Sequence, residues 1–168
     1  PRTPGFTKIR LDDAQGRAGV LGWAGVLAFS AQEAQSSPTK RGIFVLERFL
    51  CQKMNSPPPA LSLGQPEESN GVPLTTRQLA ELRMEAPACG GCHRRMDGLG
   101  LTLENFDAIG RYRTTEGATP IDARGVVEQK AANGARDLGR VLKASPTAAE
   151  CGGRNLLRYA TGRIETHD

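Results

Sequence analysis

The chain has few residues of the kinds that fill a protein core. Among its 168 residues only eight are aromatic, and Leu, Ile, Val and Phe together number 34. A share of about a fifth lies at the border below which highly charged chains stay disordered. The formal net charge is only +4, however, and 20 Gly with 11 Pro are too few for a collagen-like or low-complexity chain. We therefore expect one small folded domain with appended segments, whose interior is filled in part by something other than side chains.

The chain also lacks a basic tract. Its pI is about 9.1, yet Lys and Arg are interleaved with Asp and Glu, and no basic run contains aromatic residues. This pattern is typical of a solvated surface of mixed charge. It argues against nucleic-acid binding and leaves acidic redox proteins as suitable partners.

No apolar run is long enough to cross a membrane. The most apolar stretch, residues 18–31, has only about 14 residues, and Asp12 and Asp13 before it do not fit a signal peptide. The chain begins with Pro rather than Met, which fits a processed product or a fragment. The spacing within the stretch predicts a buried helix, with an inner face formed by Val20, Trp23, Ala24 and Leu27.

Capping residues predict four further helices. Ser37-Pro38 joins an N-cap to a proline at the first helical position, and Thr75 with Gln78 forms a capping box. Ser145-Pro146 is again an N-cap followed by a proline, and Gly162 is predicted to end a helix. We expect helices from Pro38 to Cys51, after Thr75, from Asp137 to Ala144, and from Pro146 to Gly162, the last with Leu156, Leu157 and Ala160 facing inward.

Irregular segments separate these helices. Pro57-Pro58-Pro59 begins a stiff polyproline segment, residues 60–74 are predicted to be a surface linker, and Val126-Val127 a short strand. The predicted fold is mainly α, with long irregular loops and at most a short β-hairpin. We divide it into an N-terminal helical segment (1–59), a linker and central module (60–113) and a turn-rich and helical segment (114–168), packed as one unit.

The central module contains the attachment sequence for c-type haem. Cys89-Gly90-Gly91-Cys92-His93 is a C-x-x-C-H. Two thiols one helical turn apart can add to the two vinyl groups of the macrocycle, and the next residue then places an imidazole under the iron. The chain's own content of Cys and His predicts roughly 0.001 chance occurrences of this spacing. We expect one covalent haem c, with His93 as the proximal iron ligand, in a small helical domain like that of a c-type cytochrome.

Three other interpretations of the cysteine pair are weaker. A structural zinc site needs four ligands, and beyond the motif only Cys51, Cys151 and His167 remain, with no second close pair among them. A thioredoxin-like redox pair lies between a strand and a helix in a βαβ pattern, which the sequence lacks. An uncommitted pair or a simple disulfide is the third alternative.

The distal iron ligand is left open by the sequence. Met96 follows His93 by three residues, on the same side of a helix, whereas a distal ligand approaches the opposite face of the haem. We therefore expect Met96 to pack against the haem ring. Met84 is the first candidate and Met54 the second, with His167 behind them; an open site or a ligand from another chain is the alternative.

The two cysteines outside the motif suggest a disulfide. Haem c is attached outside the cytoplasm, where disulfides persist, so Cys51 and Cys151 form a natural pair. The bridge would close a loop of about 100 residues, which the chain-entropy model credits with roughly 4.7 kcal/mol. Two buried free thiols are the alternative. We expect the bridge, and a periplasmic or cell-surface location in a bacterium.

Several segments resemble a known family. Residues 89–113, CGGCHRRMDGLGLTLENFDAIGRYR, resemble the large bacterial proteins with planctomycete-type cytochrome C domains, which are also common in myxobacteria. The similarity extends to residues 37–51 and the prolines after them, to residues 121–125 and to residues 151–163. The order of these segments along the chain matches that in the C-terminal part of such proteins. The resemblance implies an exported haem protein that contacts or once contacted further upstream domains.

The chain departs from that family at two places. Asp97-Gly98 stands where relatives often have Asp-Pro, which loosens the turn. Arg83 and then Met84 stand where many relatives carry a His six residues before the first haem cysteine, so the resemblance favours Met84 as its replacement. Polar residues after the motif are expected to form a structural network: Glu104, Asn105, Asp107, Arg111 and Arg113. Four arginines could instead pair with a haem propionate: Arg94, Arg95, Arg111 and Arg113.

These features predict an electron-transfer module more than a catalyst. A haem held by His93 and a Met passes one electron at a time, and a thioether ligand raises the potential relative to two imidazoles. The alternatives are a peroxidase-like haem enzyme with an open distal site, for which only His167 could act as acid–base group, and a structural haem subunit of a larger exported redox assembly. The scarce core residues also predict that the chain folds poorly without its haem.

Overall fold

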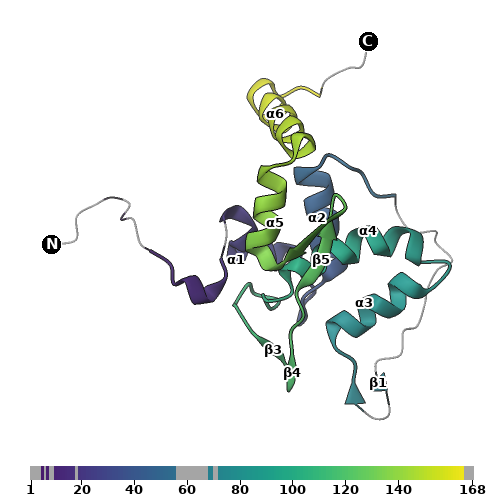
Figure 1. Cartoon of the computed structure of the whole chain (residues 1–168). Helices are drawn as coiled ribbons and strands as arrows, with labels where there is room; N and C mark the ends of the chain where they lie inside the picture. Colours follow the sequence, from purple (N-terminus) through teal and green to yellow (C-terminus); the bar gives the residue numbers. More distant parts are fainter. Residues whose placement is uncertain are drawn as a thin grey trace.

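Helices dominate the structure. The computed structural model describes residues 5, 7, 10–17, 19–55, 68–69 and 72–164, so the polyproline segment, most of the predicted linker and His167 lie outside the described residues. The helices are α1 (Ala24–Phe29), α2 (Pro38–Phe49), α3 (Thr76–Glu85), α4 (Gly90–Gly100), α5 (Gly134–Lys143) and α6 (Pro146–Thr161), with 3₁₀ turns η1 (Asp13–Gln15), η2 (Gly19–Gly22) and η3 (Leu101–Leu103). The predicted mainly α class is confirmed (Figure 1).

The capping signals lie where they were predicted. The side chain of Ser37 accepts a hydrogen bond from the backbone N–H of Lys40 at the start of α2. Thr75 and Gln78 form the reciprocal capping box of α3. Gly162 ends α6 in the left-handed region, with φ 64°. Local signals of this kind determine helix ends because they satisfy backbone groups that a helix leaves unpaired.

The β-structure is richer than expected. The described residues form three two-stranded antiparallel ladders rather than at most one hairpin: β1 (Glu68–Ser69) with β2 (Val72–Pro73), β3 (Thr115–Glu116) with β4 (Thr119–Pro120), and β5 (Arg124–Val127) with β6 (Lys130–Asn133). The β5–β6 turn places Glu128 and Gln129 at φ 47° and 65°. Such turns are usually signalled by Asn or Gly, so this one has no sequence signature.

The helices α2 and α4 approach each other backbone to backbone. A Cβ atom at Gly42 of α2 would lie 1.9 Å from the carbonyl oxygen of Met96, and one at Gly100 of α4 would lie 1.8 Å from that of Pro38. Only glycine fits at either position. The contact places α4, which carries the haem motif, directly on α2.

The core is formed mainly by α2, α4, α5 and the η3 turn, with residues of η2, α1, β5 and β6, and α2 also buries a cation. The side chain of Arg41 is fully buried and donates to the carbonyl oxygens of Leu103, Phe106 and Asp107 at 2.9, 2.6 and 2.6 Å. The carbonyl of Leu103 ends η3 and those of Phe106 and Asp107 lie shortly after it, so the guanidinium holds the chain where it leaves that turn. Burial lowers the pKa of Arg41 to about 10, which leaves it charged at neutral pH. Sequence reasoning did not anticipate this residue.

The disulfide predicted between Cys51 and Cys151 is present, with the two Cα atoms 5.4 Å apart. It joins the chain just after α2 to the first half of α6. Asn155 of α6 adds a hydrogen bond from its amide to the carbonyl oxygen of Arg48 at 3.0 Å.

Two predictions of buried helix faces were wrong. Leu156 and Leu157 of α6 are 67% and 57% exposed, and Ala160 is exposed too, because the last turns of this helix extend away from the rest of the fold (Figure 1). In the stretch 18–31, Leu27 is buried, but Trp23 is 65% exposed.

The chain interrupts that stretch at Trp23. The turn η2 ends at Gly22, and Trp23 is extended, with φ −73° and ψ 130°, before α1 begins. Arg17 holds the break by donating to the carbonyl oxygens of Gly22 and Gly110 at 2.5 and 2.9 Å. Val20 and Trp23 therefore do not share a helix with Leu27.

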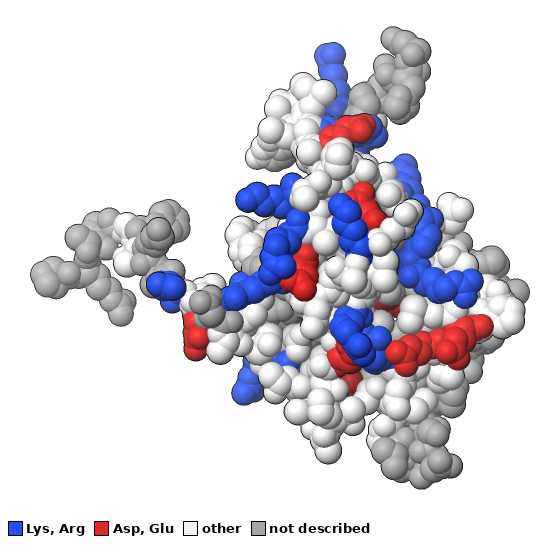
Figure 2. Space-filling model, in the orientation of Figure 1, with Lys and Arg blue, Asp and Glu red and all other residues white. Residues whose placement is uncertain are grey.

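Charges are mixed on the surface as well as along the sequence. On the face drawn in Figure 2, the Lys and Arg side chains alternate with Asp and Glu and do not merge into one basic patch. This agrees with the interpretation of the composition. No helix among the described residues is long and apolar enough to cross a membrane.

Candidate haem-binding site

The C-x-x-C-H motif occupies the first turn of α4. Cys89 is the N-cap residue, and its carbonyl oxygen accepts from the N–H groups of Cys92 and His93 at 3.2 and 3.0 Å. Cys89 is half-buried and Cys92 is exposed, and both are free thiols. The helical turn therefore places the two sulfurs on one side of α4, as attachment to a flat macrocycle requires.

The two glycines within the motif have different surroundings. A Cβ atom at Gly90 would lie 2.4 Å from the carbonyl oxygen of Met84, so this glycine lets α4 begin close to the end of α3. A Cβ atom at Gly91 would meet no atom within 4 Å. The motif is therefore crowded at Gly90, toward α3, and open at Gly91.

His93 is held by a buried carboxylate. Its Nδ1 lies 2.9 Å from Oδ2 of Asp97, one turn further along α4. Asp97 is fully buried, and the same oxygen accepts from Nε of Arg83 on α3 at 3.1 Å. Its other oxygen, Oδ1, accepts from Oγ1 of Thr39 on α2 at 2.6 Å. Asp97 thus connects three helices at the back of the imidazole.

These residues fit a c-type haem. The donor set consists of two free thiols and one imidazole, and the bond to Asp97 occupies Nδ1, which leaves Nε2 as the nitrogen for a metal. No other described residue makes a hydrogen bond to this ring. A metal-bound histidine commonly donates its second N–H to a carboxylate or carbonyl group. Sequence reasoning missed Asp97, although the i, i+4 spacing from His93 was a usable signal.

The three methionines have different surroundings. Met96 is buried in the core cluster, and Met54 packs against the same cluster. Met84 lies near the end of α3, half-buried and outside that cluster, and its carbonyl oxygen accepts from Arg94 at 2.7 Å. The third candidate, His167, falls outside the described residues.

The polar residues after the motif form a structural network. Arg113 pairs with Glu104 and also donates to Ser36 at 2.9 Å, and Ser36 donates to Glu104 at 2.5 Å. Burial raises the pKa of the Glu104 carboxyl above its ordinary value. Asp107 accepts from the backbone N–H of Arg111 at 2.8 Å. Arg113 is therefore engaged away from the motif, as the structural interpretation expected.

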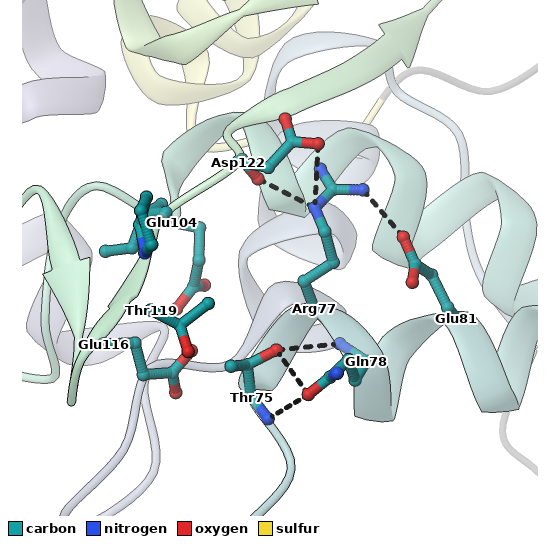
Figure 3. Close-up of a pocket in the computed structure, with 10 residues that line it drawn as sticks. Thr75, Arg77, Gln78, Glu81, Glu104, Glu116, Thr119 and Asp122 are labelled. Carbon is teal, nitrogen blue, oxygen red and sulfur yellow. Dashed lines mark hydrogen bonds and ion pairs between the residues drawn. The ribbon is translucent and has the colours of Figure 1, made fainter.

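A cleft of about 210 Å³ lies at the other end of α3 from the motif. Arg77 spans it, with Asp122 and Glu81 as partners at 3.7 and 3.1 Å, and Glu104 and Glu116 line the facing wall (Figure 3). The cleft faces the N-terminal end of α3, whereas Cys89 follows its C-terminal end. The cleft is therefore separate from the haem motif.

The zinc and thioredoxin-like interpretations of the cysteine pair gain no support. Within the described ranges, no three His, Cys, Asp or Glu side chains are grouped in a way that could hold a metal ion. The ladders there are all antiparallel, so the pair does not lie in a βαβ unit.

The fold and the motif define a class: a small, mainly α module of the cytochrome type. The model of the family PSCyt3, described as a protein of unknown function (DUF1588), matches residues 17–116, which is more than half of the chain. The chain belongs to this family, the planctomycete cytochrome C domain, in agreement with the resemblance noted from the sequence. Neither the curated proteins nor the solved structures contain a significant match.

Proposed function

We propose that this chain is an exported c-type cytochrome module that carries one covalent haem and transfers single electrons. The observation that carries the proposal is the first turn of α4, where two free thiols and an imidazole with its Nδ1 already bonded lie together. When bound, the haem supplies a one-electron Fe(III)/Fe(II) couple.

The residues of the motif have distinct roles. The thiols of Cys89 and Cys92 each add across one vinyl double bond, so that sulfur and hydrogen join its two carbons and nothing is released. His93 offers Nε2 to the iron, and Asp97 holds the ring by its other nitrogen.

We propose Met84 as the distal ligand. Of the three methionines it alone lies outside the core and the side chains packed on it, so its thioether can turn toward a bound haem without opening the core. Its position near the end of α3, only five residues before Cys89, keeps it close to the motif. A thioether ligand favours the reduced iron and raises the potential.

An extracytoplasmic location follows from the same chemistry. The disulfide between Cys51 and Cys151 is stable in an oxidising compartment, where haem c is also attached. Redox proteins, or further domains and subunits of a larger exported assembly, are the partners we propose.

Expression with the cytochrome c assembly machinery tests the attachment. A haem stain on a denaturing gel should label the wild type and fail to label the double variant Cys89→Ser/Cys92→Ser. A wild-type band without haem would overturn the proposed function.

The optical spectrum tests the distal ligand. Met84→Leu should abolish the sulfur-to-iron absorption band and convert low-spin iron to high-spin, whereas Met96→Leu, a matched change in the core, should retain both. If Met54→Leu alone removes the band, the distal role belongs to Met54.

A further inference from the structure

We infer that Asp97 is a positioning residue that makes the proximal imidazole a stronger electron donor and so lowers the reduction potential of this module. The inference rests on the proposed function, because it concerns His93 as an iron ligand. It goes beyond that function by assigning two opposite effects on the reduction potential. The thioether of Met84 would raise it, and the imidazole of His93, bonded to Asp97, would lower it.

The geometry of the pair supports a strong hydrogen bond. Nδ1 of His93 lies 2.9 Å from Oδ2 of Asp97, and both residues are on α4 one turn apart, so the helix fixes their relative position. The side chain of Asp97 is not exposed, and that of His93 is only 21% exposed. Water therefore neither competes for the carboxylate nor screens its charge.

The other partners of Asp97, a hydroxyl and a guanidinium that pairs with its negative charge, hold it in place. Thr39 Oγ1 donates to Oδ1 at 2.6 Å, so the oxygen that faces away from the imidazole is already satisfied. Arg83 Nε shares Oδ2 with His93 at 3.1 Å, and its side chain is 23% exposed. The carboxylate cannot rotate away from the ring without breaking bonds to two other helices.

A carboxylate acceptor at Nδ1 makes an imidazole a stronger electron donor to a metal. As the Nδ1 proton is drawn toward Asp97, negative charge accumulates on the ring and Nε2 becomes more basic. A more basic axial ligand stabilises Fe(III) over Fe(II), which lowers the potential, and hydrogen bonding beyond the ligand is one of the means by which a protein sets it. No bond forms or breaks in the chain when the iron accepts its one electron.

Three variants of the haem-containing protein test the inference by redox titration. Asp97→Asn keeps the size and an acceptor but removes the charge, so the potential should rise. Thr39→Val changes no charge, but it removes a donor to Asp97, and the carboxylate should then pull harder on His93 and lower the potential. Glu85→Gln is the control, since it removes one exposed negative charge on α3 that is not bonded to the imidazole.

A structural role alone would not produce shifts of opposite sign. The inference is supported if Asp97→Asn raises the potential several times more than Glu85→Gln does and if Thr39→Val lowers it. It is overturned if Asp97→Asn and Glu85→Gln give equal shifts, or if Thr39→Val leaves the potential unchanged or raises it. Should Asp97→Asn not fold, the sign of the Thr39→Val shift decides.

A spectroscopic measurement on the same proteins is independent of the potential. In the ferrous protein, the Nδ1 proton of His93 should give a downfield NMR resonance that exchanges slowly with water and moves upfield in Asp97→Asn. Fast exchange of this proton in the wild type would overturn the inference. A wild type that carries no haem would instead overturn the proposed function and the inference together, so the two failures are distinguishable by the haem stain.

Discussion

The contact between α2 and α4 makes a strong prediction for Gly42→Ala. The obstructing atoms at this position are the carbonyl oxygen and carbon of Met96, at 1.9 and 2.6 Å from the Cβ atom that alanine would add. They belong to the backbone of α4 and cannot rotate away as a side chain would. The two helices must therefore separate locally by about 1.5 Å to restore ordinary van der Waals contact.

The expected loss of stability combines two opposing effects. Overpacking of a close-packed contact costs up to about 3 kcal/mol, and a backbone obstacle puts Gly42→Ala at that upper end. Replacing glycine within a helix returns about 1 kcal/mol. The net loss is about 2 kcal/mol, or a decrease of roughly 4–8 °C in Tm for a chain of this size. Separation of the helices should also stretch the 2.6 Å bond between Thr39 and Asp97.

Urea denaturation of the haem-containing protein, followed by circular dichroism, measures this loss. Gly98→Ala on α4 is the matched control, because a Cβ atom there would meet nothing within 4 Å. It should stabilise the protein by up to about 1 kcal/mol through helix propensity alone. Equal stability changes in Gly42→Ala and Gly98→Ala would refute the close contact between the helices.

Four further measurements test other parts of the structure. Cys51→Ser/Cys151→Ser should lose up to roughly 4.7 kcal/mol in urea denaturation, since the bridge closes a loop of 100 residues; an unchanged midpoint would contradict this. Ser37→Ala should cost about 1 kcal/mol in the same assay, because the N–H of Lys40 loses its cap. Burial raises the pKa of Glu104, so folding favours its protonated form. The protonated carboxyl therefore contributes fully to the free energy of unfolding below the unfolded pKa of about 4.3, and this contribution is lost as pH rises through the folded pKa. In urea denaturation curves measured over a pH series, Glu104→Gln should remove this decrease in stability with rising pH. If the wild type instead became more stable over the same range while the variant did not, the predicted direction would be wrong. Haem-free protein should melt without cooperativity, and a cooperative melt equal to that of the holoprotein would refute the dependence on haem.

Helix ends were predictable because they depend on neighbours in sequence. Ser37-Pro38, Thr75 with Gln78, and Gly162 satisfy backbone groups within a few residues of themselves, so no distant contact is needed to interpret them. The hairpin turn at Glu128 and Gln129 was not predictable, since its conformation is uncommon for these residues and is held by the strands on either side.

Burial was less predictable than secondary structure. A helical pattern shows which residues share a face, but not whether another element covers that face. Leu156 and Leu157 share a face that nothing in the described part of the chain covers, and Trp23 is turned out by the break before α1. Arg41 is the opposite case: a charged residue is fully buried because the carbonyl groups of Leu103, Phe106 and Asp107 converge on it.

The sequence by itself determined which groups the candidate site brings together, because two thiols and an imidazole at this spacing lie on one helical turn and need no tertiary contact. It also determined the cysteines available for a bridge and the helix that begins at Ser37-Pro38. Only the tertiary structure decided what holds Asp97 behind the imidazole. Arg83 reaches it from α3, whose end lies close to the start of α4 at Gly90. Thr39 is 58 positions before Asp97, and the two meet because Gly42 and Gly100 let the backbones of α2 and α4 touch. That contact depends on the three-dimensional course of the chain, which no local pattern encodes.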